Sequence, residues 1–187
     1  MRIAILGWGS LLWEGGTEFD RWHEPWEYDG PQMMLEFSRI SASRSGALTL
    51  VIDEAHGSPA PVAWCLSKRA RVDDAVCDLC AREGTTIENI GRSVVTPREA
   101  GGEPENPITA WARPKNLDSV VWTALKSNFR EKREQSFSVP AAVAYLKTLD
   151  PAGKAKAAEY VWRAPAFVKT DLRSVLQEEP WFSEKGR

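Results

Sequence analysis

The sequence has few of the residues that build metal sites and disulfide frameworks, with three cysteines and two histidines in 187 residues. A small, odd number of cysteines fits a reducing compartment better than a disulfide scaffold. Cys77 and Cys80 form a C-x-x-C pair, but no second pair completes a zinc site. Neither His23 nor His56 has ligand spacing around it. We therefore expect a cytoplasmic protein without a bound metal ion.

The chain also lacks a dominant charge and a long apolar run. Its 24 basic and 26 acidic residues leave a formal net charge of −2, which gives no electrostatic reason to bind nucleic acid. No apolar run approaches the roughly 18 residues of a membrane span, and no cleavage site follows the apolar start. We expect one domain over residues 1–187, a monomer or homodimer with a small-molecule partner.

The most informative stretch runs from Ile3 to Trp13, with the sequence IAILGWGSLLW. A short apolar run ended by glycine predicts a buried strand that enters a tight turn. Gly7 and Gly9 can adopt positive φ and have no Cβ to keep a ligand from the backbone. Their N–H groups, with those of Ser10 and Leu11, are suited to form a small anion-binding concavity.

Two other interpretations of this turn remain open. A strand followed by Gly-x-Gly is typical of a dinucleotide site, but Leu12 stands where that motif needs a small residue. Gly15 and Gly16 then interrupt the helix that would hold the pyrophosphate. The simplest alternative is a turn whose glycines serve backbone geometry alone.

The rest of the chain predicts strands in its first two thirds and helices afterwards. Residues 14–34 predict an ordered loop over the mouth of the site, and 97–107 a surface loop rich in proline and glycine. Three strands close in sequence, at 36–41, 47–53 and 61–66, favour antiparallel pairing. Further strands are expected at 108–111 and 119–125. Helices are expected at 71–82, 139–149, from 150 through 160, and at 170–177.

Glu83 stands where the helix predicted at 71–82 stops, just before Gly84. A carboxylate at the negative end of a helix dipole is disfavoured in its ionised form and is suited to hold an ammonium group. With partial desolvation its pKa rises toward the range of a general base. The alternative is a solvated glutamate paired with Arg82.

Three segments, taken in order, resemble the γ-glutamyl cyclotransferase-like superfamily, in particular its ChaC type. They are the opening GWGSLLW, the central FSRISASRSGALTLVID and the later CAREG. The resemblance covers residues 1–90, and Trp8 stands where that family has tyrosine. It implies an α+β fold in which residues 1–125 form a small mixed, largely antiparallel β-barrel flanked by helices. Residues 139–177 would form a helical C-terminal extension packed on that core.

The resemblance also implies an activity, the release of 5-oxoproline from a small γ-glutamyl peptide or γ-glutamylamine without a cofactor. Glu83 would be the general acid and base, and Gly7, Trp8, Gly9, Ser10 and Leu11 would bind the substrate. Arg39 and Ser41 precede the strand at 47, where an arginine can clamp a leaving-group carboxylate or lie on a solvated strand face. A different class of function stays open as well: a non-catalytic protein that binds a small carboxylate or amino acid in the same pocket.

Overall fold

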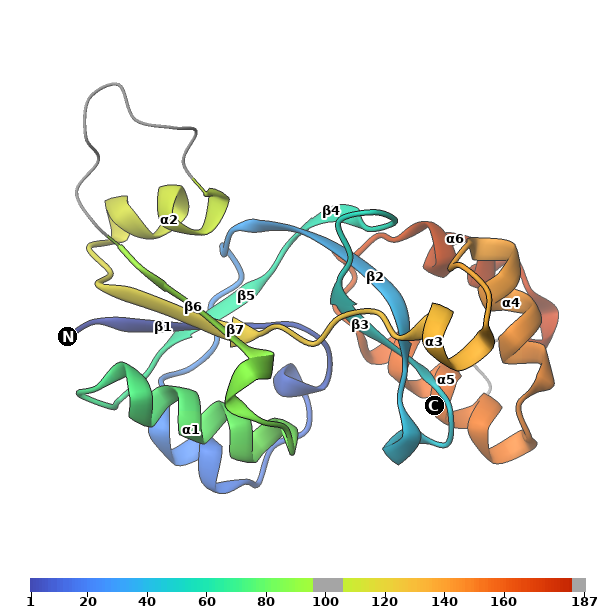
Figure 1. Cartoon of the computed structure of the whole chain (residues 1–187), viewed down its shortest axis with the longest axis horizontal. Helices are drawn as coiled ribbons and strands as arrows, with labels where there is room; N and C mark the ends of the chain where they lie inside the picture. Colours follow the sequence, from blue (N-terminus) through green and yellow to red (C-terminus); the bar gives the residue numbers. More distant parts are fainter. Residues whose placement is uncertain (96–105, 183–187) are drawn as a thin grey trace. The chain divides into compact units, whose positions relative to one another are not determined.

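The computed structural model describes residues 1–95 and 106–182, and its chain folds into two compact units. The first unit contains Met1–Gly7, Glu14–Gln32 and Pro61–Leu125. The second contains Trp8–Trp13, Met33–Ala60 and Lys126–Arg187. Each unit is thus assembled from separate stretches of sequence, which Figure 1 traces by colour.

A four-stranded sheet forms the centre of the first unit. Its strands lie in the order β5 (Ala63–Leu66), β1 (Ile3–Gly7), β7 (Ser119–Thr123) and β6 (Ile90–Val94). β1 pairs antiparallel with β5 and parallel with β7, while β6 pairs antiparallel with β7. All five residues of β1 are buried, because α1 (Val72–Glu83) and α2 (Pro107–Ala112) cover opposite faces of the sheet (Figure 1).

The sequence of α1 explains both ends of this helix. Asp73 and Asp74 occupy its first turn, where their negative charges interact favourably with the helix dipole and stabilise the helix. Gly84 ends the helix in the left-handed conformation with φ +58, a common helix termination. Val76 and Leu79 are buried, and α1 packs on β7 and on the 3-10 helix η2 (Glu18–Trp22).

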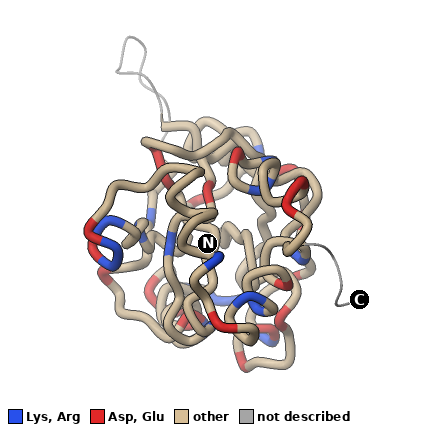
Figure 2. Tube along the Cα trace, turned by 90° about the vertical axis from the view of Figure 1, so that its right-hand side faces the viewer, with Lys and Arg blue, Asp and Glu red and all other residues tan. Residues whose placement is uncertain are grey.

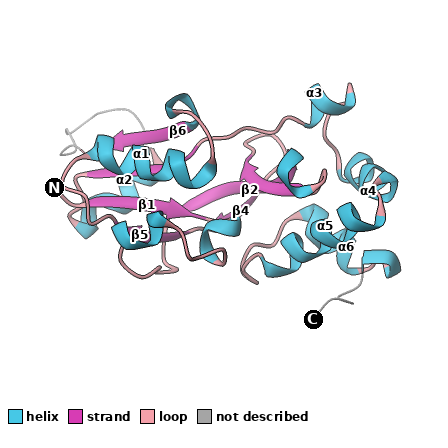
Figure 3. Ribbon diagram, turned by 90° about the horizontal axis from the view of Figure 1, so that it is seen from below, coloured by secondary structure: helices cyan, strands magenta, loops and turns pink. Residues whose placement is uncertain are grey.

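The second unit combines a three-stranded sheet with the C-terminal helices. The sheet has the order β3 (Leu48–Ile52), β2 (Gln32–Ile40) and β4 (Ser58–Pro61), and β2 pairs antiparallel with β3. Helices α3 (Phe129–Arg133), α4 (Val139–Thr148), α5 (Pro151–Arg163) and α6 (Asp171–Gln177) follow, and α5 packs on β3. Figure 3 shows α4, α5 and α6 grouped together.

Each of these last three helices begins with a side-chain cap that the sequence makes recognisable. Ser138, Asp150 and Thr170 accept hydrogen bonds from the backbone of α4, α5 and α6, and proline follows in the first turn of α4 and α5. Short 3-10 helices fill several connections. They are η1 (Gly9–Leu12), η3 (Ala42–Arg44), η4 (Ile87–Asn89), η5 (Arg113–Lys115) and η6 (Pro180–Phe182).

The α+β class predicted from the sequence is confirmed, but the strands form two open sheets instead of a closed barrel. The strand predicted at 61–66 is divided at Val62 between β4 and β5, which belong to different sheets. The strand predicted at 108–111 is wrong, because these residues form α2. Asn106 caps that helix and Pro107 occupies its first turn. Of the loop predicted at 97–107, residues 97–105 lie outside the described part of the chain.

Candidate functional site

The predicted binding turn forms the start of η1. Gly7 is the last residue of β1 and pairs with Ala63, so it is extended and does not contribute a positive φ. Trp8 is the N-cap of η1, and the residue is 8% exposed. Gly9 has φ +62, a conformation that side chains rarely adopt. Leu11 is buried and Ser10 is half-buried.

Helix α5 contacts this turn through Tyr160. A Cβ added to Gly9 would lie 2.2 Å from the Tyr160 hydroxyl oxygen and 3.2 Å from its Cζ. Glycine is thus required at position 9 for two reasons, the backbone conformation and the closeness of this hydroxyl. The sequence analysis identified the glycine, but it did not identify the tyrosine as its neighbour.

Tyr160 lies in a cluster of aromatic and basic side chains within the second unit. Its ring packs edge-on against Trp13 at 5.2 Å and against Phe37 at 6.3 Å between ring centroids. The Arg44 guanidinium carbon lies 5.1 Å from the Tyr160 ring centroid, and that of Arg163 lies 5.8 Å from the Trp13 ring centroid. Only 6% of Tyr160 is exposed, so its hydroxyl has a fixed position beside the turn.

The side chains of Arg39 and Ser41 make hydrogen bonds within the protein. The Arg39 Nη1 donates to the backbone oxygen of Lys126 at 2.7 Å. Ser41 lies just beyond β2, and its hydroxyl is 3.2 Å from that of Ser43. Arg39 and Ser41 do not share a strand face, because β2 ends at Ile40 and the chain then turns into η3. The structure places Arg44, at the end of η3, over Tyr160.

Glu83 is the last residue of α1, as the sequence predicts, and belongs to the first unit. Its side chain is 19% exposed, less than the alternative interpretation of a solvated glutamate expects, although Arg82 lies beside it as that interpretation predicts. The Arg82 Nη1 lies 4.0 Å from Glu83 Oε1, a long separation for an ion pair, and Arg82 Nη2 donates to the Glu14 backbone oxygen at 2.9 Å. Glu83 is therefore a largely buried carboxylate beside a guanidinium that also holds the chain after β1.

The second unit contains two buried acidic residues that the sequence analysis did not identify as candidates. Glu36 is fully buried in β2, and its Oε1 accepts a 2.7 Å hydrogen bond from the Phe37 N–H. Burial raises the pKa of the Glu36 carboxyl despite this bond. Burial also opposes ionisation of Asp53, but hydrogen bonds, including those from His56, leave its pKa lowered. Both carboxylates hold the backbone, so their burial has a structural explanation.

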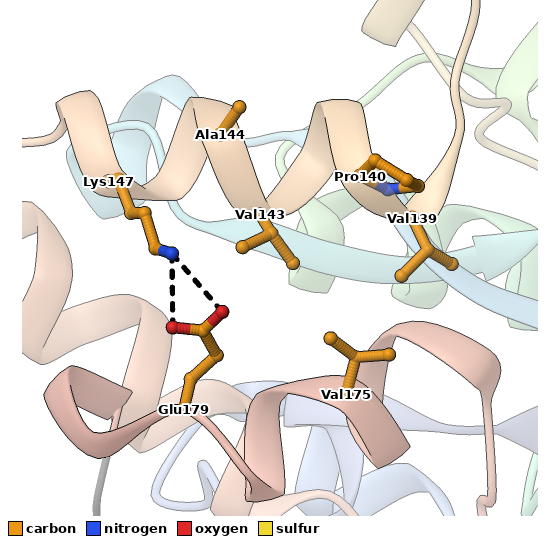
Figure 4. A pocket seen from close by; sticks show the side chains of 7 residues that line it. All are labelled: Val139, Pro140, Val143, Ala144, Lys147, Val175 and Glu179. Carbon is orange, nitrogen blue, oxygen red and sulfur yellow. Dashed lines mark hydrogen bonds and ion pairs between the residues drawn. The ribbon is translucent and has the colours of Figure 1, made fainter.

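A groove of about 420 Å³ lies between α4 and α6 (Figure 4). Most of its lining is apolar, and an ion pair between Lys147 and Glu179, with 3.1 Å between Nζ and Oε2, closes one end. The residues nominated from the sequence are not among those that line it. Its lining residues are Val139, Pro140, Val143, Ala144, Lys147, Val175 and Glu179.

The surroundings of these sites contain no dominant charge. Figure 2 shows basic and acidic residues interspersed along the trace. Within residues 1–95 and 106–182, no three His, Cys, Asp or Glu side chains are grouped as a metal site. Among the same residues, no helix is long and apolar enough to cross a bilayer. The chain matches no protein-family model, no curated protein and no solved structure, and the resemblance drawn from its motifs stays a prediction.

Proposed function

We propose that the protein is a γ-glutamyl cyclotransferase-like enzyme that releases 5-oxoproline from a small γ-glutamyl peptide or γ-glutamylamine. The observation that carries the proposal is the position of Glu83, a largely buried carboxylate at the C-terminal end of α1. An ionisable group that is withdrawn from water at a helix end is a recurrent feature of catalytic acids and bases. The order of motifs around it, GWGSLLW before CAREG, adds the second line of support.

In the proposed reaction, Glu83 holds the α-ammonium group of the substrate and accepts a proton from it. The α-amine nitrogen then attacks the side-chain carbonyl carbon, a C–N bond forms within the glutamyl group, and the bond to the leaving amine breaks. After the attack, the ring nitrogen loses a second proton and becomes the N–H of 5-oxoproline. Glu83 delivers one proton to the leaving nitrogen as its bond breaks, the released amine takes up the other, and Glu83 ends ionised as it began. A positioned acid and base of this kind contributes about 10²–10⁴-fold in rate.

The turn from Gly7 to Leu11 has the task of holding the substrate α-carboxylate through backbone N–H groups. The nucleophile and the electrophile belong to one molecule, so fixing its conformation lowers the barrier further, by up to about 7–11 kcal/mol in well-aligned intramolecular reactions. The positive φ of Gly9 is consistent with this assignment, because it turns the backbone sharply after β1.

The test is release of 5-oxoproline, measured by mass spectrometry, from glutathione, γ-glutamyl dipeptides and γ-glutamyl-lysine. Glu83→Gln keeps the size of the side chain and removes the base, so we expect a folded protein with turnover reduced by about 10²-fold or more. Glu88→Gln, a neutralisation at a well-exposed position of the same unit, is the matched control and should keep activity. A fully active Glu83→Gln protein would contradict the proposal.

One observation favours a second function, a binding protein for a small carboxylate or amino acid. Trp8 offers an indole N–H, which donates a hydrogen bond but cannot accept one, where the resembling family has a hydroxyl. A ligand at 100 times its Kd would then stabilise the protein by about 2.7 kcal/mol. Thermal stabilisation by γ-glutamyl compounds without any 5-oxoproline would identify this function.

A further inference from the structure

We propose that the groove between α4 and α6 binds a free apolar amino acid, whose side chain lies among the valines and whose two charged groups lie at the ion pair. The groove has a volume of about 420 Å³, within the range of small-molecule sites, and its lining belongs entirely to the second unit. The residues proposed above for catalysis are not among those that line it. The inference is therefore independent of the cyclotransferase activity.

Two rows of side chains line the groove, and helical spacing explains each row. Val139, Val143 and Lys147 are four residues apart, so they share one face of α4. Val175 and Glu179 are also four residues apart, one near the end of α6 and the other just beyond it. Figure 4 shows the two rows pointing toward each other. The groove thus has an apolar part and one charged end.

The apolar part of the groove is open to a ligand. Val175 is 41% exposed, and it is one of five large apolar residues that are exposed in the part of the chain that the structure describes. Val139 is half-buried, and Val143 is 8% exposed. A ligand that covers such a surface removes apolar area from water, which favours binding. The groove therefore favours a ligand with an apolar side chain.

Trp181, in η6, holds both charged groups at the end of the groove. Its indole N–H donates to the Glu179 carboxylate, whose two oxygens each lie 3.1 Å from the Lys147 Nζ. The same Nζ lies 5.8 Å from the Trp181 ring centroid. The side chain of Lys147 is 50% exposed and that of Glu179 is 23% exposed, so a ligand in water can reach both charges. Because these groups are already positioned, binding costs less conformational entropy.

Two opposite charges side by side favour a ligand that itself carries both charges. An aliphatic acid would bring its carboxylate beside that of Glu179, and an aliphatic amine would bring its ammonium group beside that of Lys147. A free amino acid instead places its carboxylate beside Lys147 and its ammonium group beside Glu179. The existing ion pair then stays intact, because an ammonium group has three N–H donors to share. A peptide bond removes one of the two charges, so the free amino acid is favoured over a peptide.

The first experiment titrates the full chain with leucine, N-acetylleucine and leucinamide and measures binding by calorimetry. N-acetylleucine lacks the positive charge of leucine, and leucinamide lacks its negative charge. We expect leucine to bind about tenfold or more tightly than either probe, the preference expected of one hydrogen-bonded charge. Alanine, whose apolar side chain is shorter, should bind about tenfold more weakly than leucine.

Variants of the lining residues test whether the groove is the site. Lys147→Gln should reduce the preference for leucine over leucinamide to about twofold or less, and Glu179→Gln should do the same for the preference over N-acetylleucine. Val175→Asp places a charge among the valines and should weaken leucine binding about tenfold or more. Glu178→Gln and Lys156→Gln neutralise exposed residues outside the lining, so these matched controls should bind as the wild type does.

A wild type that does not prefer leucine to both probes overturns the inference, and so do groove variants that keep every preference. Glu83→Gln separates this site from the proposed active site, because it should bind leucine as the wild type does. Loss of leucine binding in Glu83→Gln would place the amino acid at the other site and overturn the inference. Melting temperatures show whether each variant is folded, and if Lys147→Gln or Glu179→Gln is not, Val175→Asp at its exposed position still tests the groove.

Discussion

Replacing Gly9 with alanine tests the contact between the turn and α5. At φ +62 a residue with a Cβ costs about 1–2 kcal/mol in backbone conformation. The new Cβ would also lie 2.2 Å from the Tyr160 hydroxyl oxygen, and forcing a packed ring aside costs about 1–3 kcal/mol. We therefore expect Gly9→Ala to lower the free energy of unfolding by about 2–5 kcal/mol.

Tyr160→Phe should rescue part of this loss. Without the hydroxyl, the nearest ring atom to the new Cβ is Cζ at 3.2 Å, a tight contact that a small shift relieves. Urea unfolding of the wild type, both single variants and the double variant gives the coupling energy. We expect it to be about 1–3 kcal/mol, because the double variant keeps the backbone strain and loses the steric clash.

Gly84 supplies the control for backbone strain alone. It has φ +58, and no heavy atom lies within 4 Å of a Cβ placed there. Gly84→Ala should thus cost about 1–2 kcal/mol, with no dependence on Tyr160. Two results would contradict the contact between Gly9 and Tyr160. One is a loss of unfolding free energy in Gly9→Ala no larger than that in Gly84→Ala, and the other is a coupling energy with Tyr160→Phe below about 0.5 kcal/mol.

Three further predictions concern buried titratable groups. Because the pKa of Glu36 is raised in the folded state, the stability of the wild type relative to Glu36→Gln should be greatest below about pH 4.3 and fall as pH rises through the raised pKa. The pKa of Asp53 is lowered, so the advantage of the wild type over Asp53→Asn, about 1–2 kcal/mol at neutral pH, should vanish as acid protonates Asp53. Urea unfolding across pH checks both. In thiol labelling of the native protein, exposed Cys77 should react first, while Cys65, whose pKa is strongly raised by burial, should react only on unfolding.

The elements that were predicted correctly are those whose defining residues lie close together in the sequence. The helix at α1 has an apolar face and a terminal glycine, and α5 begins with the Asp-Pro pair that starts helices. The strand LTLVI of β3 follows a Ser-Gly turn. In each case the residues that define the element lie within about one helical turn of its ends, so one window of sequence contains the information.

Elsewhere the deciding contacts are distant in sequence. β6 was missed because its sequence, IGRSV, has weak strand propensity, and it is held by pairing with β7. Gly91 lies under Trp122, where a Cβ would be 2.2 Å from the indole, so its glycine is fixed by tertiary packing. The segment at 108–111 is too short for periodicity to separate a helix from a strand. Closure of the strands into a barrel also depends on pairings between strands that are distant in sequence, so the local pattern could not decide it.

The candidate site shows the same division between local and distant information. Gly9 and Glu83 were found from sequence because a glycine after a strand and a carboxylate at a helix end are local patterns. The sequence did not indicate Tyr160 as a neighbour of Gly9, because more than half the chain separates the two residues. Its position in α5 is that of an ordinary core residue. Yet Tyr160 brings a hydroxyl to the turn in a chain that has Trp8 where its resembling family has a tyrosine. A phenol hydroxyl both donates and accepts hydrogen bonds, whereas the Trp8 indole only donates, and no local pattern of the sequence indicated this contact.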